Sequence, residues 1–120
     1  MAPKLRPPSP EATAAVPWLA WLPSRQFRVI GVVSSVDEVP ARLPRKAVVV
    51  VEGPRGPSWV AFDCPCSRRH RVLVPVSTHA FPHWRLVSER PFTLHPSIDI
   101  ITHGVRCHYW IRGGSVLWAP

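Results

Sequence analysis

The sequence predicts a small all-β domain, an antiparallel sheet or sandwich stabilised by a bound metal. Short runs of β-branched and aromatic residues recur along the chain and are separated by glycine- and proline-rich turns, a pattern typical of strands. Proline accounts for 16 of the 120 residues, and proline cannot continue the interior of a helix. No amphipathic helix of ordinary length is visible, and the length fits one domain.

The beginning of the chain differs from the rest. Six prolines lie within residues 1–24, so residues 1–15 are expected to form a flexible, proline-rich arm. The segment from Val16 to Leu22 contains Trp18 and Trp21 and is too apolar to remain in water, so it either packs on the domain or docks a partner. The domain itself is therefore expected to span residues 16–120.

The expected elements follow from local composition. Strands are expected at 27–33, 46–52, 58–63, 69–76, 83–87, 92–98, 106–112 and 115–118, with a turn or short capped helical turn at 37–40. Residues 53–57 form a tight loop, and Gly113-Gly114 forms a two-residue hairpin turn. Pro75 places its strand at a sheet edge or ends it, and Pro96 breaks another strand.

The charge of the chain limits its partners. The chain carries 15 Lys and Arg against 7 Asp and Glu, a net charge of +8, and thirteen of the cations are arginine. An acidic protein or a nucleic acid is therefore a plausible partner. No secretory signal pattern and no stretch of about 18 apolar residues is present, so a cytoplasmic protein without a membrane span is expected.

The three cysteines indicate a metal site. Cys64 and Cys66 form a C-P-C turn, and Cys107 lies beside His108. Thiolates and imidazoles are the ligands of structural zinc, and residues two apart on a strand face the same side. The fourth ligand is His108 or His70: neighbouring residues of a regular strand point oppositely, which His108 must overcome and His70 need not. Buried, metal-free thiols are the alternative.

Several stretches carry a resemblance to a family of small bacterial proteins. They are Pro44-Arg45-Lys46, Trp59–Phe62 leading into the C-P-C turn, Trp84-Arg85-Leu86, Thr93–Ile98, and Cys107–Trp118. The chain resembles this family over residues 44–118. Its members show a C-P-C-G-C-G turn, a T-L-x-P-S-[IV] segment and an [SC]-H-F-W-I-R-x-G hairpin, and their genes often stand beside ubiquitin-like, E1-like, E2-like and JAB-type components implicated in defence against phage.

The resemblance implies a metal-binding accessory protein of such a system. Ser67 stands where the family has a third cysteine, so the set that uses only matching positions, Cys64, Cys66, Cys107 and His108, is preferred for one structural Zn²⁺. No H-E-x-x-H motif, P-loop or nucleophile elbow is present. We therefore expect a non-catalytic adaptor, with an E3-like role as one form of it and an enzyme as the less favoured alternative.

The expected partner of this adaptor is a ubiquitin-like protein or an E1- or E2-like enzyme, with single-stranded nucleic acid as the alternative. Arginine and tryptophan dominate binding hot spots. The expected contact residues are Arg68, Arg69, Arg112 and Trp110.

Overall fold

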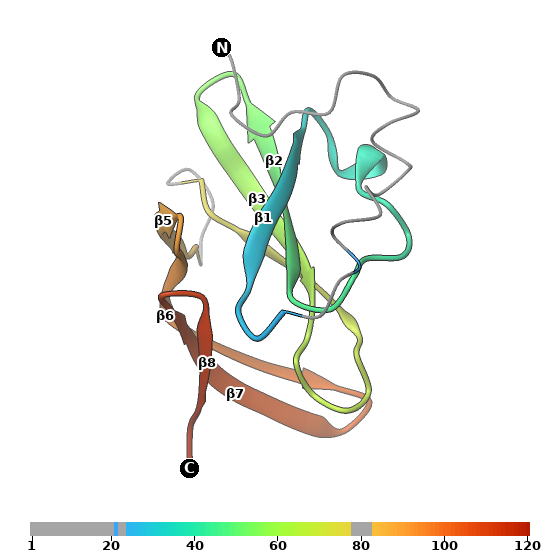
Figure 1. The fold of residues 1–120 in the computed structure, drawn as a ribbon, viewed down its shortest axis with the longest axis vertical. Coiled ribbons are helices and arrows are strands. Elements are labelled where there is room, and N and C mark those ends of the chain that lie inside the picture. Colours follow the sequence, from blue (N-terminus) through green and yellow to red (C-terminus); the bar gives the residue numbers. More distant parts are fainter. Residues whose placement is uncertain (1–20, 22–23, 78–82) are drawn as a thin grey trace.

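The structure, a computed structural model, describes residue 21, residues 24–77 and residues 83–120. These residues form the all-β fold that the sequence predicts (Figure 1). The proposed arm at 1–15 lies outside the described residues. The described elements are β1 (Arg28–Val33), the 3₁₀ turn η2 (Val36–Glu38), β2 (Ala47–Gly53), β3 (Gly56–Asp63), β4 (Arg71–Pro75), β5 (Arg85–Glu89), β6 (Phe92–Thr102), β7 (Val105–Arg112) and β8 (Ser115–Trp118).

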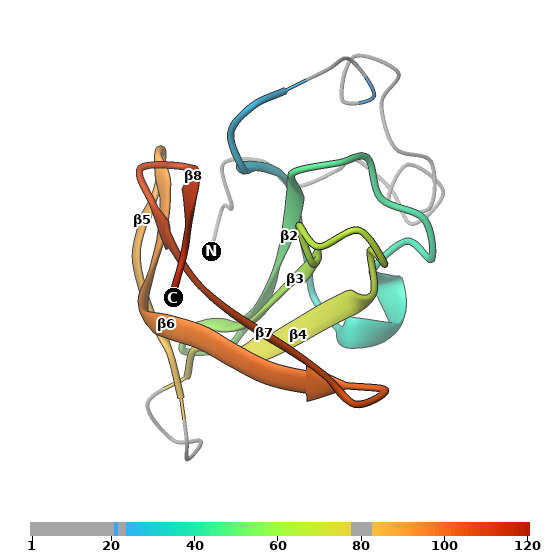
Figure 2. The same cartoon turned by 90° about the horizontal axis from the view of Figure 1, so that it is seen from below.

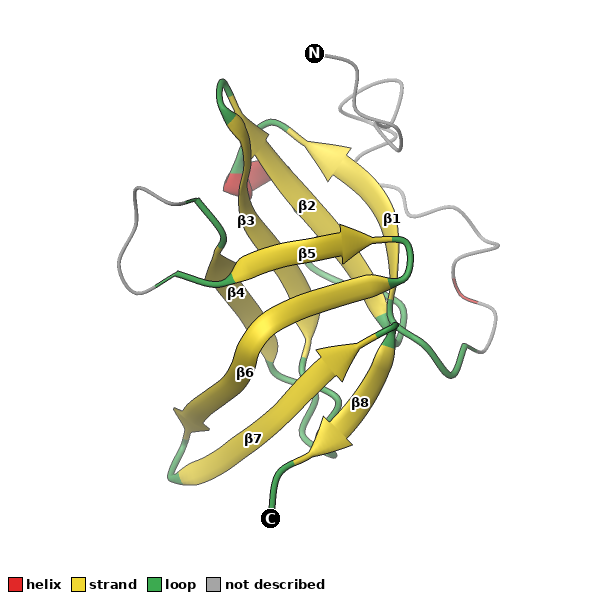
Figure 3. Ribbon diagram, turned by 90° about the vertical axis from the view of Figure 1, so that its left-hand side faces the viewer, coloured by secondary structure: helices red, strands yellow, loops and turns green. Residues whose placement is uncertain are grey.

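The strands form two four-stranded sheets that follow chain order. The first is β1-β2-β3-β4 and the second is β5-β6-β7-β8. All neighbours are antiparallel except β1 and β2, which are parallel because the connection through η2 returns the chain to the starting end. The second sheet crosses in front of the first in Figure 3, and Figure 2 shows β6 and β7 facing β3 and β4.

The core lies between the two sheets. Three phenylalanines meet there, Phe27 before β1, Phe62 on β3 and Phe92 on β6, with ring centroids 5.2 to 6.3 Å apart. Side chains alternate across β7, so that Cys107, Tyr109 and Ile111 are buried while the residues between them are only half-buried. The inner face of β7 thus belongs to the core, whereas the side chains of its outer face are free of core packing.

One hydrogen bond ties the segment before β1 to the turn that ends β7, and a second holds that turn on β6. The amide of Phe27 donates to the carbonyl of Gly114 at 2.7 Å, and the amide of Gly114 donates to Phe92 at 2.8 Å. Gly114 has a φ of +80°, and a Cβ there would lie 3.0 Å from the side chain of Gln26 and 3.1 Å from the carbonyl oxygen of Phe27. Only glycine fits both the turn and this close approach.

The observed strands confirm the predicted order, and the largest difference in length is at β6. β6 runs through Pro96 to Thr102, because the β6–β7 register shifts between Leu94 and Ile98. Proline lacks an N–H, and within such a bulge it removes no ladder bond. His103 and Gly104, both with positive φ, form the next hairpin turn, which was not predicted. Pro75 does end an edge strand, as expected.

Among the described residues, no helix is long and apolar enough to cross a membrane.

Candidate active site and metal centre

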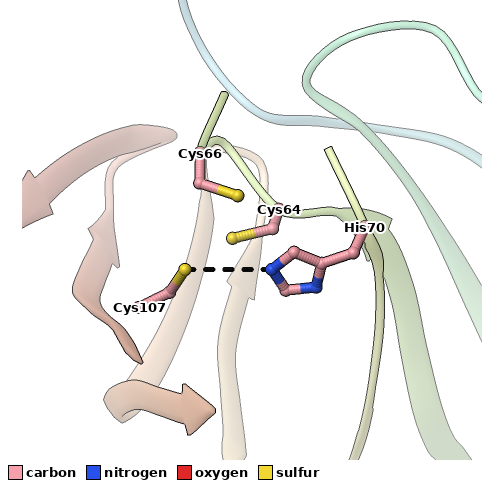
Figure 4. A group of neighbouring side chains, drawn as sticks. All are labelled: Cys64, Cys66, His70 and Cys107. Carbon is pink, nitrogen blue, oxygen red and sulfur yellow. Dashed lines mark hydrogen bonds between the residues drawn. The ribbon is translucent and has the colours of Figure 1, made fainter. Parts of the chain in front are cut away.

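The three cysteines lie together between the two sheets. Cys64 and Cys66 come from the turn after β3, His70 directly precedes β4, and Cys107 comes from β7 (Figure 4). One ligand atom from each of these four residues lies within 4.8 Å of the others, and Cys107 Sγ is 3.8 Å from His70 Nε2. Because three thiols and an imidazole converge, the cluster could hold a metal ion that joins the two sheets.

The loop 64–70 is closed by its own backbone. The amide of Cys64 donates to the carbonyl of His70 at 2.8 Å, and the amide of Arg69 donates to Cys66 at 3.2 Å. Arg69 adopts a positive φ of 52°, and its guanidinium donates to the carbonyl of Leu43 at 2.6 Å. These bonds turn the chain back on itself, so that His70 returns to the side of the cysteines.

The cysteine electrostatics depend on burial and local hydrogen bonds. Burial raises the pKa of Cys64 to about 12, although the hydroxyl of Tyr109 donates to its sulfur at 3.4 Å. Burial also raises the pKa of Cys107. Burial opposes ionisation of Cys66 too, but the backbone amides of Arg68 and Arg69 bring its pKa below the usual value. A bound cation would favour the thiolate form of all three.

His108 lies outside this cluster. It follows Cys107 on a regular part of β7, so its side chain projects from the opposite face of the sheet. The bend that would bring it to the cysteines is not present, and His70, the histidine that the sequence left open, takes its place in the cluster. The three predicted cysteines are brought together, whereas the predicted histidine is not.

On the outer face, His108 meets a serine. Ser97 Oγ of β6 lies 3.0 Å from His108 Nε2, and both side chains are half-buried. A serine hydroxyl that hydrogen-bonds to an imidazole nitrogen at this distance is the arrangement of an activated nucleophile and its general base. The ring of Trp110 covers one side of the imidazole, with centroids 5.5 Å apart.

Ser97 is positioned by the bulge of β6. Four steps along β6, from Leu94 to Ile98, correspond to only two along β7, from Ile111 to Tyr109. Bulges often redirect a side chain beside an active site. Within the bulge the carbonyl of Ser97 accepts a hydrogen bond from Trp84 Nε1 at 3.0 Å. This indole, half-buried against the core, fixes the backbone that carries the hydroxyl.

An acidic residue lies directly opposite the histidine. Asp99 pairs with His108 in the β6–β7 register, and Arg106 holds its carboxylate with two bonds of 2.8 and 2.6 Å. Those hydrogen bonds from Arg106 lower the pKa of Asp99, and the nearby charge of His108 lowers it further. Asp99 is therefore ionised at neutral pH. Its negative charge pairs with Arg106 and also acts on His108.

Comparison with known families decides where the chain belongs. A family described as bacterial ubiquitination-like system serine protease (BubE) matches residues 35–119, which is more than half of the chain. The chain belongs to the BubE family. Comparison with curated proteins and with solved structures finds no match.

The BubE family confirms the expected association with a bacterial ubiquitination-like system. Its description as a serine protease family does not favour the non-catalytic adaptor role expected from the sequence. The sequence contains no contiguous catalytic motif, and the contact between Ser97 and His108, eleven residues away, was not predicted from it. The signal was present in the resemblance, because the T-L-x-P-S-[IV] segment and the C-H-[FY]-W hairpin contain the two residues.

The expected partner-binding residues occupy different settings. Arg112 lies over the ring of Trp110 at 5.4 Å on the outer face of β7, close to His108. Arg68 is exposed, whereas Arg69 bonds to Leu43 and lies 3.4 Å from Asp63. Arg112 and Trp110 therefore adjoin the Ser97–His108 pair, while Arg69 supports the loop of the cysteine cluster.

Proposed function

We propose that this BubE-family chain is a serine protease in which Ser97 is the nucleophile and His108 is the general base. The observation that carries the proposal is the 3.0 Å contact between Ser97 Oγ and His108 Nε2 on a half-buried surface. The description of the family supports the same chemistry. Neither residue is needed for the core, because both project from the outer face of the second sheet.

The proposed reaction is acyl transfer. Ser97 Oγ attacks the carbonyl carbon of the scissile peptide bond and gives its proton to His108 Nε2. The imidazolium then donates that proton to the leaving amine nitrogen as the C–N bond breaks, which leaves an ester on Ser97. Water attacks the ester with His108 again as base, and the imidazolium returns that proton to Ser97 Oγ as the C–O bond breaks and the carboxylate product leaves.

The neighbouring residues support this step without taking part in bond making. Trp84 holds the Ser97 carbonyl, so the hydroxyl keeps its distance from the imidazole. Asp99, directly across from His108, stabilises the positive charge that develops on the ring, although Arg106 offsets much of its effect. The pair acts as a dyad with a nearby carboxylate.

The substrate we propose is a protein of the same pathway. A protease of a ubiquitination-like system must bind a ubiquitin-like protein or one of its conjugates, which keeps the expected partner class but makes the partner a substrate. Arg112 and Trp110 lie beside the dyad, where they would contact that protein. A role in antiphage defence and a cytoplasmic location stay predictions.

We further propose that Cys64, Cys66, Cys107 and His70 bind one zinc ion. Three thiolates and one imidazole suit zinc and fill a tetrahedral site. With four protein ligands no position is left for water or substrate, so the metal would serve as a cross-link between the sheets. Elemental analysis should find about one zinc per chain in the purified protein.

A fluorescent fluorophosphonate, which modifies activated serines covalently, tests the nucleophile directly. The wild-type protein should be labelled on the peptide that contains Ser97, and S97A should not be labelled. S115A is the matched control, since Ser115 is an exposed serine on β8. S97A should also fail to cleave a ubiquitin-like substrate protein of the same system.

Two results would overturn the proposal. One is a folded wild-type protein in which Ser97 is not labelled by the probe. The other is a S97A protein that retains full cleavage activity. Salt-sensitive binding of single-stranded DNA by such an inactive protein would instead favour the nucleic-acid alternative.

A further inference from the structure

A groove of about 850 Å³ separates the β2–β3 hairpin from β5. Residues 52–58 line one wall, residues 85–90 line the other, and residues 76–77 close one end. The volume falls in the range of functional binding pockets. The groove is distinct from the cysteine cluster, which lies on the loop at the far end of β3.

The wall formed by β5 is the edge of its sheet. In the second sheet β5 has β6 on one side and no described strand on the other. Where β5 begins, it is joined to the first sheet, because the amide of Trp84 donates to the carbonyl of Pro75. An edge strand that faces a groove can accept an extended peptide as an additional strand.

The exposed charged residues at the rim of the groove are all positive. Arg55, Arg85 and Arg90 are exposed, whereas the two acidic residues of the lining, Glu52 and Glu89, are half-buried. An incoming chain therefore meets arginines first, and arginine pairs readily with carboxylates.

The groove also offers apolar contacts. Val87 of β5 is 50% exposed, and Leu86 packs against the core beside it. The combination suits a segment in which acidic and apolar side chains alternate, because alternate residues of a strand face opposite sides.

The groove begins next to the dyad. Arg85 pairs with His95 of β6, two residues before Ser97. The preceding residue, Trp84, donates to the carbonyl of Ser97. The Arg85 end of the groove therefore lies beside the part of β6 that carries the nucleophile.

We propose that this groove binds an extended segment of the protein substrate, with alternating acidic and apolar residues, as a strand added to β5. The inference rests on the proposed protease function for the purpose of the segment, which is to reach Ser97. Binding in the groove can nevertheless be measured without cleavage.

The experiment uses the full chain carrying S97A and two fluorescent decapeptides, one alternating Glu with Val and one alternating Lys with Val. Fluorescence anisotropy should show that the Glu peptide binds at least about ten-fold more tightly than the Lys peptide. R85E together with R90E should abolish or reverse this preference. R25E together with R45E is the matched control, because both arginines are exposed and neither lines the groove.

A third peptide tests the strand addition. Methylation of alternate backbone nitrogens of the Glu peptide removes hydrogen-bond donors and should weaken binding by about ten-fold or more. Equal affinity for the Glu and Lys peptides would overturn the groove proposal. Equal effects of the two double variants would do the same. So would unaltered binding of the methylated peptide, or displacement by oligothymidine at lower concentration than by unlabelled Glu peptide.

Fluorophosphonate labelling separates the two proposals. If Ser97 is labelled but the groove shows no preference, the protease proposal stands and the groove proposal fails. If the groove binds the Glu peptide selectively but Ser97 is not labelled, the groove is a docking site and the protease proposal fails.

Discussion

The two faces of β7 carry two different kinds of chemistry within one step of the chain. Cys107 projects inward to a buried cluster of thiols, and His108 projects outward to a half-buried serine. The inner cluster suits a metal site filled by four protein ligands, whereas the outer pair, in the proposed protease, must admit a substrate. Period-two alternation of a single strand separates them.

The difference teaches how such a small domain can support a reactive surface. The outer face contributes little to the core, so polar and reactive side chains can lie there without disturbing core packing. The backbone that carries them is fixed from behind, since Cys107 and Tyr109 anchor β7 to the first sheet through the cluster and through Cys64. Disturbing the outer face should therefore leave the inner face intact. Disturbing the inner face should also affect the outer face.

The largest expected effect is on activity alone. H108Q removes the base, and the rate of cleavage should fall by about 10³-fold or more. Zinc content and the thermal midpoint should not change, because His108 lies outside the cysteine cluster. Metal analysis and melting curves are measured on the same preparation as activity. Loss of zinc in this variant would mean that His108, and not His70, is the fourth ligand.

Loss of a cysteine from the inner cluster should reduce both the stability of the fold and the activity of the outer site. C66S removes one thiolate, so the ion and the cross-link between the sheets are lost, and the free energy of unfolding should fall by about 3 kcal/mol or more. Activity should fall as well, because β7 loses its anchor. S67A, one residue along the same turn, is the control. A C66S protein with an unchanged melting temperature would show that the cluster does not stabilise the fold.

The inner face was easier to predict from the sequence than the outer face. Three cysteines in a proline-rich chain indicate a metal on composition and spacing alone, and alternation along a strand already raised the objection to His108. The structure is consistent with that objection, since β7 is regular at Cys107. The preference for His108 followed the family pattern, which marks a residue as important without saying what it does.

The outer site depends on long-range register, which local pattern does not contain. Ser97 reaches His108 only because β6 bulges at residues 95–97 and then continues to Thr102. Pro96 predicted a break in the strand there, whereas its missing N–H is compatible with the bulge. The strands themselves were predictable because valine runs, Gly-Gly turns and short spacings act locally.

A smaller effect is expected from the support behind the nucleophile. W84F keeps the ring in the core but removes the N–H that bonds to Ser97, so kcat should fall by about ten-fold with KM nearly unchanged. W118F is the matched control, because Trp118 packs on Tyr109 with ring centroids 5.0 Å apart and does not contact Ser97. A purely structural role for Trp84 would lower the melting temperature and leave the rate of fluorophosphonate labelling unchanged.

The smallest effect is expected from the carboxylate opposite His108. D99N removes a negative charge that favours the imidazolium, but Arg106 already offsets that charge in an exposed ion pair, so kcat should fall by only about two- to five-fold. Arg106 lowers the pKa of Asp99 below 3.8, so the pair stabilises the fold above that pH and the contribution is lost as pH falls through the folded-state pKa. The melting temperatures of wild type and D99N should therefore differ slightly at pH 7 and converge in more acidic solution, whereas D37N, at an exposed acid on η2, should leave kcat unchanged. A loss of kcat as large as that of H108Q would contradict this ranking and make Asp99 a full third member of the site.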